Sequence, residues 1–443
     1  MSLKVGMVSL GCAKNQVDGE VLMASTRNAG FELTDDAGLA DIAIVNTCGF
    51  INSAKQESIE EILELVTLKN EGQIKKIVVT GCLAERYQHE IKEDIPEVDA
   101  VIGIGANGNI GELLKKMMEE GTVESYPDKY DMPLCGEREL TTPSYFAYLK
   151  IAEGCDNKCT YCAIPMIRGG FRSRTIENIM EEARGLVADG AKELIVIAQD
   201  TSRYGIDLYG EFSLAKLLRE LCTIEDLKWI RVLYCYPDSI TDELIDTIAA
   251  EEKIVKYMDI PLQHASGPVL KNMNRRGNRE SLTALMNKMR QRIPGLIIRT
   301  TFITGFPGET EEDFTELAEF VKEVRFDRMG CFPYSQEEGT VAGEMEDQID
   351  DDIKEHRAEL IMDSQMRIME DKNQEYIGEV LEVMTEGFDR YAECYFGRSY
   401  MDSPDVDGKV FFAPGSRRPK YGEFVKVQID DAMDCDLMGT MLD

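Results

Sequence analysis

The feature that most constrains the fold is a repeated alternation of short apolar runs with amphipathic helical stretches. In residues 1–120, the apolar runs have the length of buried parallel strands: 4–10, 41–47, 75–81 and 99–105. Helix-like stretches such as 15–30 and 53–70 lie between them. Parallel strands need such crossovers, so this region predicts an open, Rossmann-like α/β sheet.

A second series of the same kind follows residues 121–143, which are polar, contain Pro and Gly, and are expected to form a linker. Its candidate strands are 146–154, 193–200, 229–236, 256–262, 296–305 and 328–335. Six βα units predict a partial (β/α)6 barrel over 144–375, in which a charged helix at about 350–376 comes last. The overall class is therefore α/β and multidomain.

The last segment, 376–443, changes character. Apolar and polar residues alternate there, and Gly, Pro and Asp separate the alternating runs. This pattern predicts a small antiparallel β-barrel.

Composition limits the class of protein. The 443 residues contain no apolar run near the ~20 residues of a membrane span, and no secretory layout at the start, so we expect a cytoplasmic protein without a membrane partner. Twelve cysteines in such a protein favour metal or redox chemistry over disulfides. The net charge of −33 disfavours nucleic-acid binding, although it could equally serve solubility alone.

Three cysteines, Cys155, Cys159 and Cys162, lie within eight residues, directly after the first strand of the second series. Clustered thiolates bind soft metals, but a structural zinc site needs a fourth ligand that no neighbouring Cys or His supplies. A four-iron cluster on three cysteines keeps one iron open. Such barrels carry active sites after their strands, so we expect an iron–sulfur centre, with a zinc knuckle completed by a distant residue as the alternative.

Three further cysteines, Cys12, Cys48 and Cys82, are far apart in sequence, yet each follows a predicted strand of the first series. The carboxyl ends of parallel strands share one edge of a sheet, so these thiols should converge there. Gly11 and Gly81 precede two of them and allow close backbone approach. We expect a second cluster with an open iron; the alternative is three small buried residues.

Other motifs carry weaker signals. GIGANG at 103–108 fits GxGxxG, but it follows the fourth strand, so we interpret it as a strand-to-helix turn without nicotinamide binding. The histidines are isolated in sequence, and His264, which we expect near the cavity, is interpreted as structural. Most of the remaining cysteines are expected to pack structurally: Cys135, Cys222, Cys235, Cys331, Cys394 and Cys435.

The Cys-x3-Cys-x2-Cys spacing resembles the signature of the radical S-adenosylmethionine (SAM) superfamily. Nearly the whole chain resembles the radical SAM methylthiotransferases, which have an N-terminal three-cysteine domain, a radical SAM barrel and a C-terminal TRAM β-barrel. The ribosomal-protein (RimO-like) branch is indicated by these motifs: SLGCAKNQVD (9–18), NTCGFI (46–51), CAIPMIRGGFRSR (162–174), AQDTSRYGIDLYG (198–210), DIPLQHAS (259–266) and GFPGET (305–310). Ala13 is a small departure from the commoner Cys-Pro-Lys.

The resemblance implies two [4Fe–4S] clusters, SAM, and an electron donor such as flavodoxin or ferredoxin. The barrel cluster, on the cysteines of 155–162, would cleave SAM to a 5′-deoxyadenosyl radical. The N-terminal cluster, on Cys12, Cys48 and Cys82, would present sulfur, and a second SAM would supply the methyl group. Cys155, Cys159 and Cys162 are therefore the expected catalytic ligands.

The implied substrate is the β-carbon of an aspartate in the twelfth protein of the small ribosomal subunit. General bases supply typically ~10²–10⁴-fold, too little for so weak an acid, whereas a radical removes a hydrogen atom directly. Two alternatives are methylthiolation of isopentenyladenosine in tRNA and a non-catalytic, metal-stabilised binding adaptor. Residues 378–443 carry 14 Asp/Glu against 7 Lys/Arg, which favours a basic ribosomal protein over tRNA.

Position along the second series suggests further cofactor contacts. They are Gln199, Asp200, Arg299, Thr301, Gly305 and Gly308. Each is equally compatible with a strand-end cap or a turn. Arg168, Arg172 and Arg174 follow the cysteine loop; they could hold a carboxylate of substrate or cofactor, or form salt bridges within this acidic protein.

Overall fold

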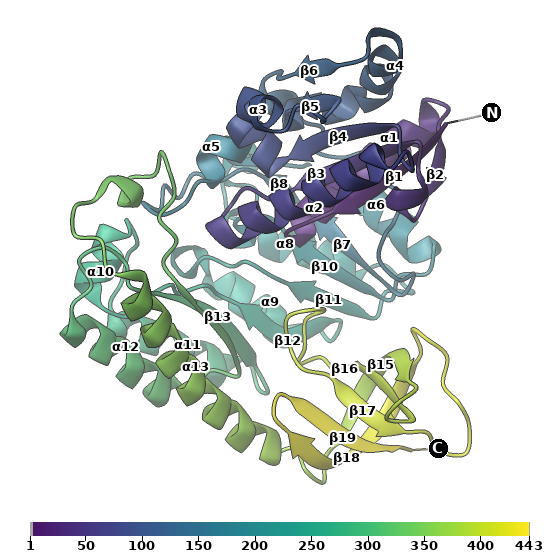
Figure 1. Ribbon diagram of the computed structural model, residues 1–443. Coiled ribbons are helices and arrows are strands. Elements are labelled where there is room, and N and C mark those ends of the chain that lie inside the picture. The colour runs from purple at the N-terminus through teal and green to yellow at the C-terminus, as the bar shows by residue number, and fades with distance from the viewer. Residues whose placement is uncertain (1–2, 443) are drawn as a thin grey trace.

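The computed structural model describes residues 3–442, which form three units along the chain (Figure 1). The first is a parallel sheet of order β2-β1-β3-β4-β5-β6. Its strands are β1 (Lys4–Ser9), β2 (Glu32–Thr34), β3 (Ile42–Thr47), β4 (Lys76–Gly81), β5 (Ala100–Ile102) and β6 (Val123–Ser125). Its helices are α1 (Ala13–Asn28), α2 (Asn52–Asn70), α3 (Cys82–Asp94) and α4 (Ile110–Glu120). Helices α2 and α3 pack on one face and α1 and α4 on the other, so the sheet is buried between them.

Two strands of this sheet were not expected from the sequence. β2 and β6 have three residues each and contain polar side chains, so their apolar pattern is too short to stand out. β6 lies within the stretch expected as a linker and pairs with β5. Residues 104–109 form a 3-10 turn between β5 and α4, as the GIGANG segment predicts. The division of the chain near residue 120 stays a prediction.

The second unit is a parallel, six-stranded sheet of order β14-β13-β12-β11-β10-β7. Its strands are β7 (Phe146–Lys150), β10 (Glu193–Ile197), β11 (Trp229–Val232), β12 (Ile254–Asp259), β13 (Ile297–Thr304) and β14 (Arg328–Pro333). β7 and β14 do not pair, so the barrel is partial, as predicted. A small antiparallel pair, β8 (Ala152–Glu153) with β9 (Arg172–Ser173), brackets the cysteine loop.

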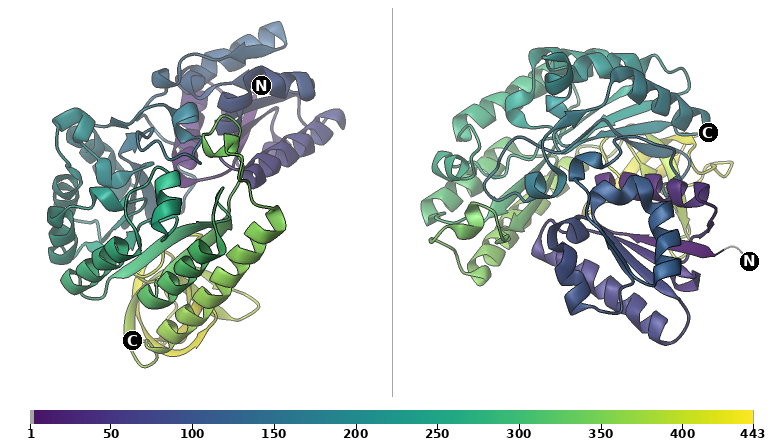
Figure 2. Two further views of the ribbon diagram at one scale, coloured as in Figure 1. Left: turned by 90° about the vertical axis from the view of Figure 1, so that its left-hand side faces the viewer. Right: turned by 90° about the horizontal axis from the view of Figure 1, so that it is seen from above.

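The helices of this unit are α5 (Ile164–Arg168), α6 (Ile176–Ala188), α7 (Ile206–Tyr209), α8 (Leu214–Cys222), α9 (Asp242–Ala250), α10 (Gly267–Asn272), α11 (Arg279–Arg292), α12 (Glu311–Val324) and α13 (Asp351–Gln374). The longer ones lie along the outside of this curved sheet (Figure 2), whereas the short α5 packs against α3 of the N-terminal unit. Alternate strand residues divide between two cores: Leu194 and Val196 pack in the core that includes the helices, while Ile195 and Ile197 pack toward the third unit. Within residues 3–442, no helix combines the length and apolar character needed to cross a membrane.

The third unit is a closed, five-stranded barrel of order β15-β16-β17-β19-β18. Its strands are β15 (Val380–Asp389), β16 (Cys394–Arg398), β17 (Val410–Ala413), β18 (Phe424–Met433) and β19 (Asp436–Met441). The predicted antiparallel pairing holds except between β17 and β19, which are parallel.

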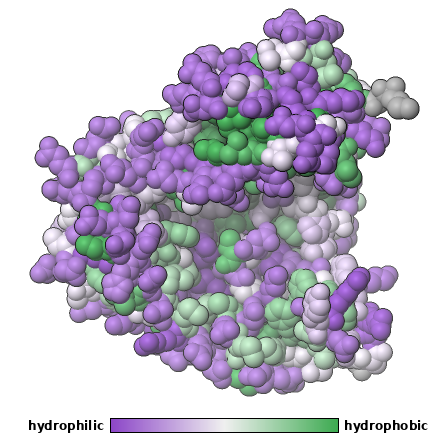
Figure 3. Space-filling view, in the orientation of Figure 1, coloured by the Kyte–Doolittle hydropathy of each residue, from purple (hydrophilic) through white to green (hydrophobic). Residues whose placement is uncertain are grey.

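The small barrel docks near the amino ends of the central strands. Glu193, the first residue of β10, is fully buried and pairs with Arg231 and with Arg398 of the small barrel, each at 2.7 Å. The carboxyl ends of the same strands remain available to the N-terminal unit. Figure 3 shows the surface hollowed between the N-terminal unit and the small barrel.

Candidate active site

The thiols of Cys12, Cys48 and Cys82 converge at one edge of the first sheet. They follow β1, β3 and β4, which are neighbours in the sheet. Burial raises the pKa of Cys48 to about 12, and the nearby Cys82 and Cys12 thiols add to the rise. Cys12 differs, because Lys14 and Arg168 outweigh burial and lower its pKa. The three residues are therefore neighbours, as the topology argument predicts, and we call them the N-terminal trio.

Glycines make this convergence possible. Gly81 has a φ of +92°, and a Cβ there would lie 2.5 Å from the backbone oxygen of Thr47. A Cβ on Gly11 would lie 2.8 Å from Cβ and 3.0 Å from Sγ of Cys48. Side chains at either position would push neighbouring strand ends apart.

Cys155, Cys159 and Cys162, the barrel trio, lie on one loop between β8 and α5. The amide of Cys155 donates to the oxygen of Gly169 at 3.1 Å, and the amide of Cys162 donates to the oxygen of Cys159 at 3.1 Å. All three are partly accessible. Burial raises the pKa of Cys155 to about 11.

The two trios meet. Cys82 packs with Ala163, the residue directly after Cys162, and with Ile167 of α5. Cys12 is accessible although it lies where the N-terminal unit faces the barrel. The six thiols therefore border the junction between the carboxyl ends of both sheets.

A buried charge network joins the two units beside this junction. The guanidinium of Arg168 contacts the carboxylates of Asp18 and Glu153, and lies 3.2 Å from Sγ of Cys82. Lys150 pairs with Glu153 at 2.7 Å and also with Asp18. All four charged residues are at most 5% exposed, and two cations balance two anions. Such a network is stable when it is complete and costly when one member is missing.

The arginines after the cysteine loop bind the protein itself. Arg168 belongs to the network above. Arg172 donates to the oxygen of Tyr130 at 2.8 Å, and Arg174 pairs with Glu182 at 2.6 Å. Salt bridges, the second interpretation given above, account for the contacts of Arg168 and Arg174, whereas Arg172 binds backbone oxygens.

The barrel trio has a different buried cation, Arg275. Its guanidinium lies 3.8 Å from Sγ of Cys159 and 3.4 Å from the hydroxyl of Tyr161. It also stacks 4.2 Å from the centroid of the Tyr236 ring and donates to the oxygen of Pro261 at 2.6 Å. No carboxylate in residues 3–442 pairs with it, so its positive charge faces the trio uncompensated.

Two of the expected cofactor contacts lie near the cysteine loop. Gln199 donates to Glu153 at 2.6 Å, while its own Oε1 is buried without a hydrogen-bond partner. Asp200 accepts from Asn157 of the loop at 2.8 Å and from Ser202 at 2.7 Å, and burial raises its pKa. Gln199 therefore has an unused acceptor, its Oε1, whereas Asp200 holds the cysteine loop through Asn157.

The other four expected contacts bind elsewhere in the protein. Arg299 pairs with Asp259 at 3.1 Å and, at 3.5 Å, with Asp407 of the small barrel. A Cβ on Gly305 would lie 2.1 Å from Cγ of Lys354, so this glycine allows α13 to pack closely. The amide of Gly308 donates to the oxygen of Asp347 at 2.9 Å, and the oxygen of Thr301 accepts from the amide of Gln263 at 2.8 Å. None of these contacts reaches a cysteine loop.

His264 is fully buried and internally bonded. Its Nδ1 accepts from the amide of Ser266 at 3.0 Å, and its Nε2 lies 3.4 Å from Glu309. Nε2 is buried and has no hydrogen-bond partner within residues 3–442, so only one of the two ring nitrogens is satisfied, and the structural interpretation of this histidine stays a prediction.

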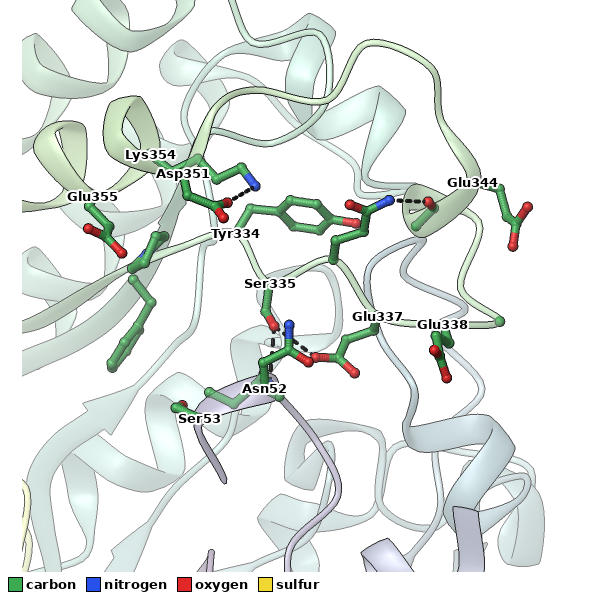
Figure 4. Close-up of a pocket in the computed structure, with 16 residues that line it drawn as sticks. Asn52, Ser53, Tyr334, Ser335, Glu337, Glu338, Glu344, Asp351, Lys354 and Glu355 are labelled. Atoms are coloured by element: carbon green, nitrogen blue, oxygen red, sulfur yellow. Dashed lines mark hydrogen bonds and ion pairs between the residues drawn. The ribbon is translucent and has the colours of Figure 1, made fainter. Parts of the chain in front are cut away.

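A pocket of about 590 Å³ opens where the N-terminal unit meets the end of β14 (Figure 4). The amide of Asn52 donates to Ser335 at 3.2 Å across it, and Ser335 donates to Glu337 at 2.7 Å. Further acidic side chains line it: Glu338, Glu344, Asp351 and Glu355. Lys354 is the one cationic side chain among its lining residues, so the wall is acidic.

Each donor set consists of three free thiols, the ligand type that iron–sulfur clusters use. Within residues 3–442, no three His, Cys, Asp or Glu side chains are grouped tightly enough for one ion. A single zinc needs every ligand at about 2.0–2.3 Å from one point, whereas each cysteine of a four-iron cluster binds a different iron. Two sets of three thiols, each bordering accessible space, suit the second arrangement.

Two buried cations at the site escaped the sequence analysis. Arg275 is more than a hundred residues from the loop it contacts, so no spacing connects them. Lys14 lies two residues after Cys12, and its ammonium is 3.3 Å from the centroid of the Tyr234 ring in the barrel. The sequence could have pointed to Lys14, because this lysine is only two residues from Cys12, a candidate cluster ligand.

Three family models match the chain in the order of its units. They are the uncharacterized protein family UPF0004 over residues 4–103, the radical SAM superfamily over 149–321 and the TRAM domain over 377–442. A match to the radical SAM superfamily implies a [4Fe–4S] cluster and SAM.

Solved structures share the fold at low identity. The radical SAM methyltransferase TsrM from Kitasatospora setae, with cobalamin and a [4Fe–4S] cluster bound, has a TM-score of 0.59 at 15% identity over 77% of each chain. The cobalamin-dependent radical enzyme OxsB has a TM-score of 0.52 at 14% identity, covering 82% of this chain and 56% of that one. These likenesses concern the fold alone.

Full-length relatives are much closer. The ribosomal protein uS12 methylthiotransferase RimO of Clostridioides difficile (strain 630) is 48% identical over 445 residues, which cover 99% of each chain. The enzyme of the same name from Desulforamulus reducens is 50% identical over 442 residues, again 99% of each. The resemblance to the RimO-like branch is thereby confirmed, and the chain belongs to the ribosomal protein uS12 methylthiotransferase (RimO) family of radical SAM enzymes.

Proposed function

We propose that this enzyme methylthiolates the β-carbon of an aspartate in ribosomal protein uS12, the twelfth protein of the small ribosomal subunit. Its full-length relatives carry the name uS12 methylthiotransferase. The observation that carries the proposal is the packing of Cys82, a member of the N-terminal trio, against Ala163, the residue that follows Cys162 of the barrel trio. A reaction that joins sulfur to a carbon radical needs both sources at one place.

The N-terminal trio and the barrel trio would each hold one [4Fe–4S] cluster, and SAM would bind at the barrel trio. When bound, these groups supply a carbon radical that removes a hydrogen atom, and sulfur and a methyl group for the product. The protein fixes their positions: Asp200 holds Asn157 of the barrel loop, and Arg168 ties that loop's helix to Asp18 in α1 of the N-terminal unit. The orphaned Oε1 of Gln199 is an acceptor for a donor group of SAM.

The other residues expected at the cofactor, and the three segments of the chain, can also be given roles. Asp200, Arg299, Thr301, Gly305 and Gly308 would act by shaping the barrel around the cofactor. Residues 1–120 would form the sulfur-supplying domain, 144–375 the radical SAM barrel and 376–443 the TRAM domain. Twelve free cysteines suit a reducing cytoplasm, where a flavodoxin or ferredoxin would supply the electron.

The acidic pocket at the junction supports a basic protein partner. Its wall presents Glu338, Glu344 and Glu355 beside the trios' domain junction, and an opposite charge on the substrate would speed encounter and fix orientation. Binding of tRNA would instead need a basic stripe on the small barrel. That barrel exposes one short basic loop, Arg417–Lys420, in which Arg417 pairs with Glu423 at 2.6 Å.

The test is anaerobic incubation of the reconstituted enzyme with SAM, a sulfur source and a reductant. A uS12 peptide containing the aspartate and, separately, isopentenylated tRNA are offered as substrates. We expect a methylthio group on the peptide aspartate by mass spectrometry and none on the tRNA. Modification of the tRNA alone would contradict the substrate assignment, and modification of neither would contradict the proposed reaction.

A further inference from the structure

Some carboxylates of the acidic pocket at the end of β14 have no partner cation among residues 3–442. Glu337 pairs with Lys55 at 2.9 Å and with Arg86 at 2.6 Å. Asp351 pairs with Lys354 at 2.8 Å. The lining carboxylates that form no ion pair in this part of the chain are all exposed; they are Glu338, Glu344 and Glu355. Water can satisfy an exposed carboxylate, so these three alone do not indicate a ligand.

Tyr334, in the same pocket, has a polar group that is not satisfied. The residue is only 4% exposed, and its hydroxyl is buried without a hydrogen-bond partner in the described part of the chain. The hydroxyl of the nearby Thr340 is engaged, because it donates to the oxygen of Glu337 at 2.7 Å and accepts from the amide of Gly343 at 3.1 Å. A buried tyrosine hydroxyl usually has a partner, so this one indicates a place for a polar group of a ligand.

The unpaired carboxylates lie on two sides of Tyr334. Figure 4 shows the Tyr334 ring in the middle of the pocket, with Glu355 on one side and Glu338 and Glu344 on the other. Phe332, which is 51% exposed, adds apolar surface to the same lining. A pocket of about 590 Å³ with two negative ends suits an extended peptide, whose basic side chains can pack their apolar stems and reach the carboxylates.

One wall of the pocket, residues 332–344, also contacts the loops of both cysteine trios. The amide of Ala342 donates to the oxygen of Thr160, within the loop of the barrel trio, at 2.9 Å. Arg86, which pairs with the buried carboxylate of this wall, donates to the oxygen of Gly49 at 3.0 Å. Gly49 follows one cysteine of the N-terminal trio. A peptide held in the pocket is therefore anchored next to both loops.

We propose that this pocket binds an extended segment of uS12, with one basic side chain held by Glu355 and another by Glu338 and Glu344. The Tyr334 hydroxyl bonds a backbone group of the segment between them. This inference rests on the proposed function and deepens it by assigning a substrate-binding site outside the trios. Two anchors on one segment set its register, so the target aspartate is presented at the junction.

The experiment measures peptide binding rather than turnover. Reconstituted enzyme, anaerobic and without reductant, is titrated with a labelled uS12 peptide that contains the aspartate. Further peptides have each Arg or Lys replaced in turn by Gln. The enzyme variants are Glu355→Gln, the double variant Glu338→Gln/Glu344→Gln, and Tyr334→Phe. Iron content and thermal unfolding check that each variant folds, and the two single variants replace the double variant if it does not.

A control variant removes negative charge elsewhere. It replaces three exposed glutamates by Gln that lie outside the pocket and form no ion pair within residues 3–442: Glu181, Glu220 and Glu252. This control removes more charge than either pocket variant, so it shows what the general acidity of the protein contributes to binding.

We expect two basic positions of the peptide at which replacement weakens binding to the unmodified enzyme by about 10- to 100-fold. Glu355→Gln should weaken binding of the unchanged peptide by a similar factor and remove the sensitivity at one position. The double variant should do the same at the other position. Tyr334→Phe should weaken every peptide by about 3- to 10-fold, and the control should stay within about 3-fold of the unmodified enzyme.

Sensitivities that persist in both pocket variants would overturn the inference and leave the proposed function intact, because the basic side chains would then bind elsewhere. A peptide series without a sensitive position would overturn it as well. So would a control that weakens binding as much as the pocket variants. Unchanged binding by Tyr334→Phe would contradict the contact with the hydroxyl. If the unmodified enzyme binds no uS12 peptide, the proposed function fails and the inference fails with it.

Discussion

The two cysteine trios present the same number of thiols at the carboxyl ends of parallel strands, but they are assembled differently. The barrel trio lies on one loop of eight residues, whereas the N-terminal trio needs three strands in the correct order. Their cations differ as well. Arg275 faces Cys159 without a carboxylate partner, whereas Arg168, near Cys82, belongs to a balanced network. The barrel trio is thus a local structure in a positive environment, and the N-terminal trio depends on the tertiary fold.

The largest expected effect separates the chemistry of the trios. Cys159→Ala should abolish deoxyadenosine formation, a loss of ~100-fold or more, because a ligand matters at least as much as its outer-shell partners. Cys48→Ala should spare deoxyadenosine formation and stop sulfur insertion. Deoxyadenosine and the methylthiolated peptide are both measured by chromatography after anaerobic incubation. Sulfur transfer by Cys48→Ala would contradict the division of labour.

The next effect concerns the network that joins the units. Arg168→Met leaves Asp18 and Glu153 sharing only Lys150, and should lower the free energy of unfolding by ~3–5 kcal/mol. Urea denaturation measures this loss. The control Arg219→Met removes an exposed pair with Glu243 and should cost ~1 kcal/mol or less. Equal losses in the two variants would mean that the network does not stabilise the junction.

A smaller change tests the dependence of the N-terminal trio on the fold. Gly81→Ala introduces a Cβ 2.5 Å from the oxygen of Thr47 at a φ of +92°, and should cost ~1–3 kcal/mol. Iron per chain should fall from ~8 toward ~4, because only the N-terminal trio is displaced. Gly72→Ala is the control: its φ is +78°, but a Cβ there meets nothing within 4 Å. Full iron content in Gly81→Ala would show that the trio tolerates displacement.

The smallest effect concerns the unpaired cation. Arg275→Met removes a positive charge 3.8 Å from Sγ of Cys159. The reduced cluster is more negative, so its potential should fall by an amount on the order of tens of millivolts. The N-terminal cluster should keep its potential. Potentiometric titration followed by electron paramagnetic resonance measures the potentials of both clusters. An unchanged potential of the barrel cluster would show that Arg275 does not influence it.

The sequence predicts much of this architecture because buried parallel strands appear as continuous apolar runs. β3 and β10, for example, are buried along their whole length and stand out clearly. β6, with only Val123 buried, carries no such pattern, and its place is decided by pairing with β5. The parallel pairing of β17 with β19 depends on barrel closure, which no local pattern encodes.

The residues of the candidate site also fall into those that the sequence predicts and those that depend on tertiary packing. Cysteine spacing identifies the barrel trio, and strand order brings Cys12, Cys48 and Cys82 together. Position along a strand does not tell which end of the barrel a side chain serves, so Arg299 was expected at the cofactor although it pairs with Asp407 of the small barrel. Arg275 could not be found, because its contact with Cys159 depends on tertiary packing.

The most direct test of two separate clusters at one junction is iron content after anaerobic reconstitution. The chain should bind ~8 irons. A variant with Cys12, Cys48 and Cys82 changed to Ala should bind ~4, and so should one with Cys155, Cys159 and Cys162 changed to Ala. If the unmodified chain bound only ~4 irons and either triple variant bound none, the six cysteines would share one cluster. That result would contradict the account.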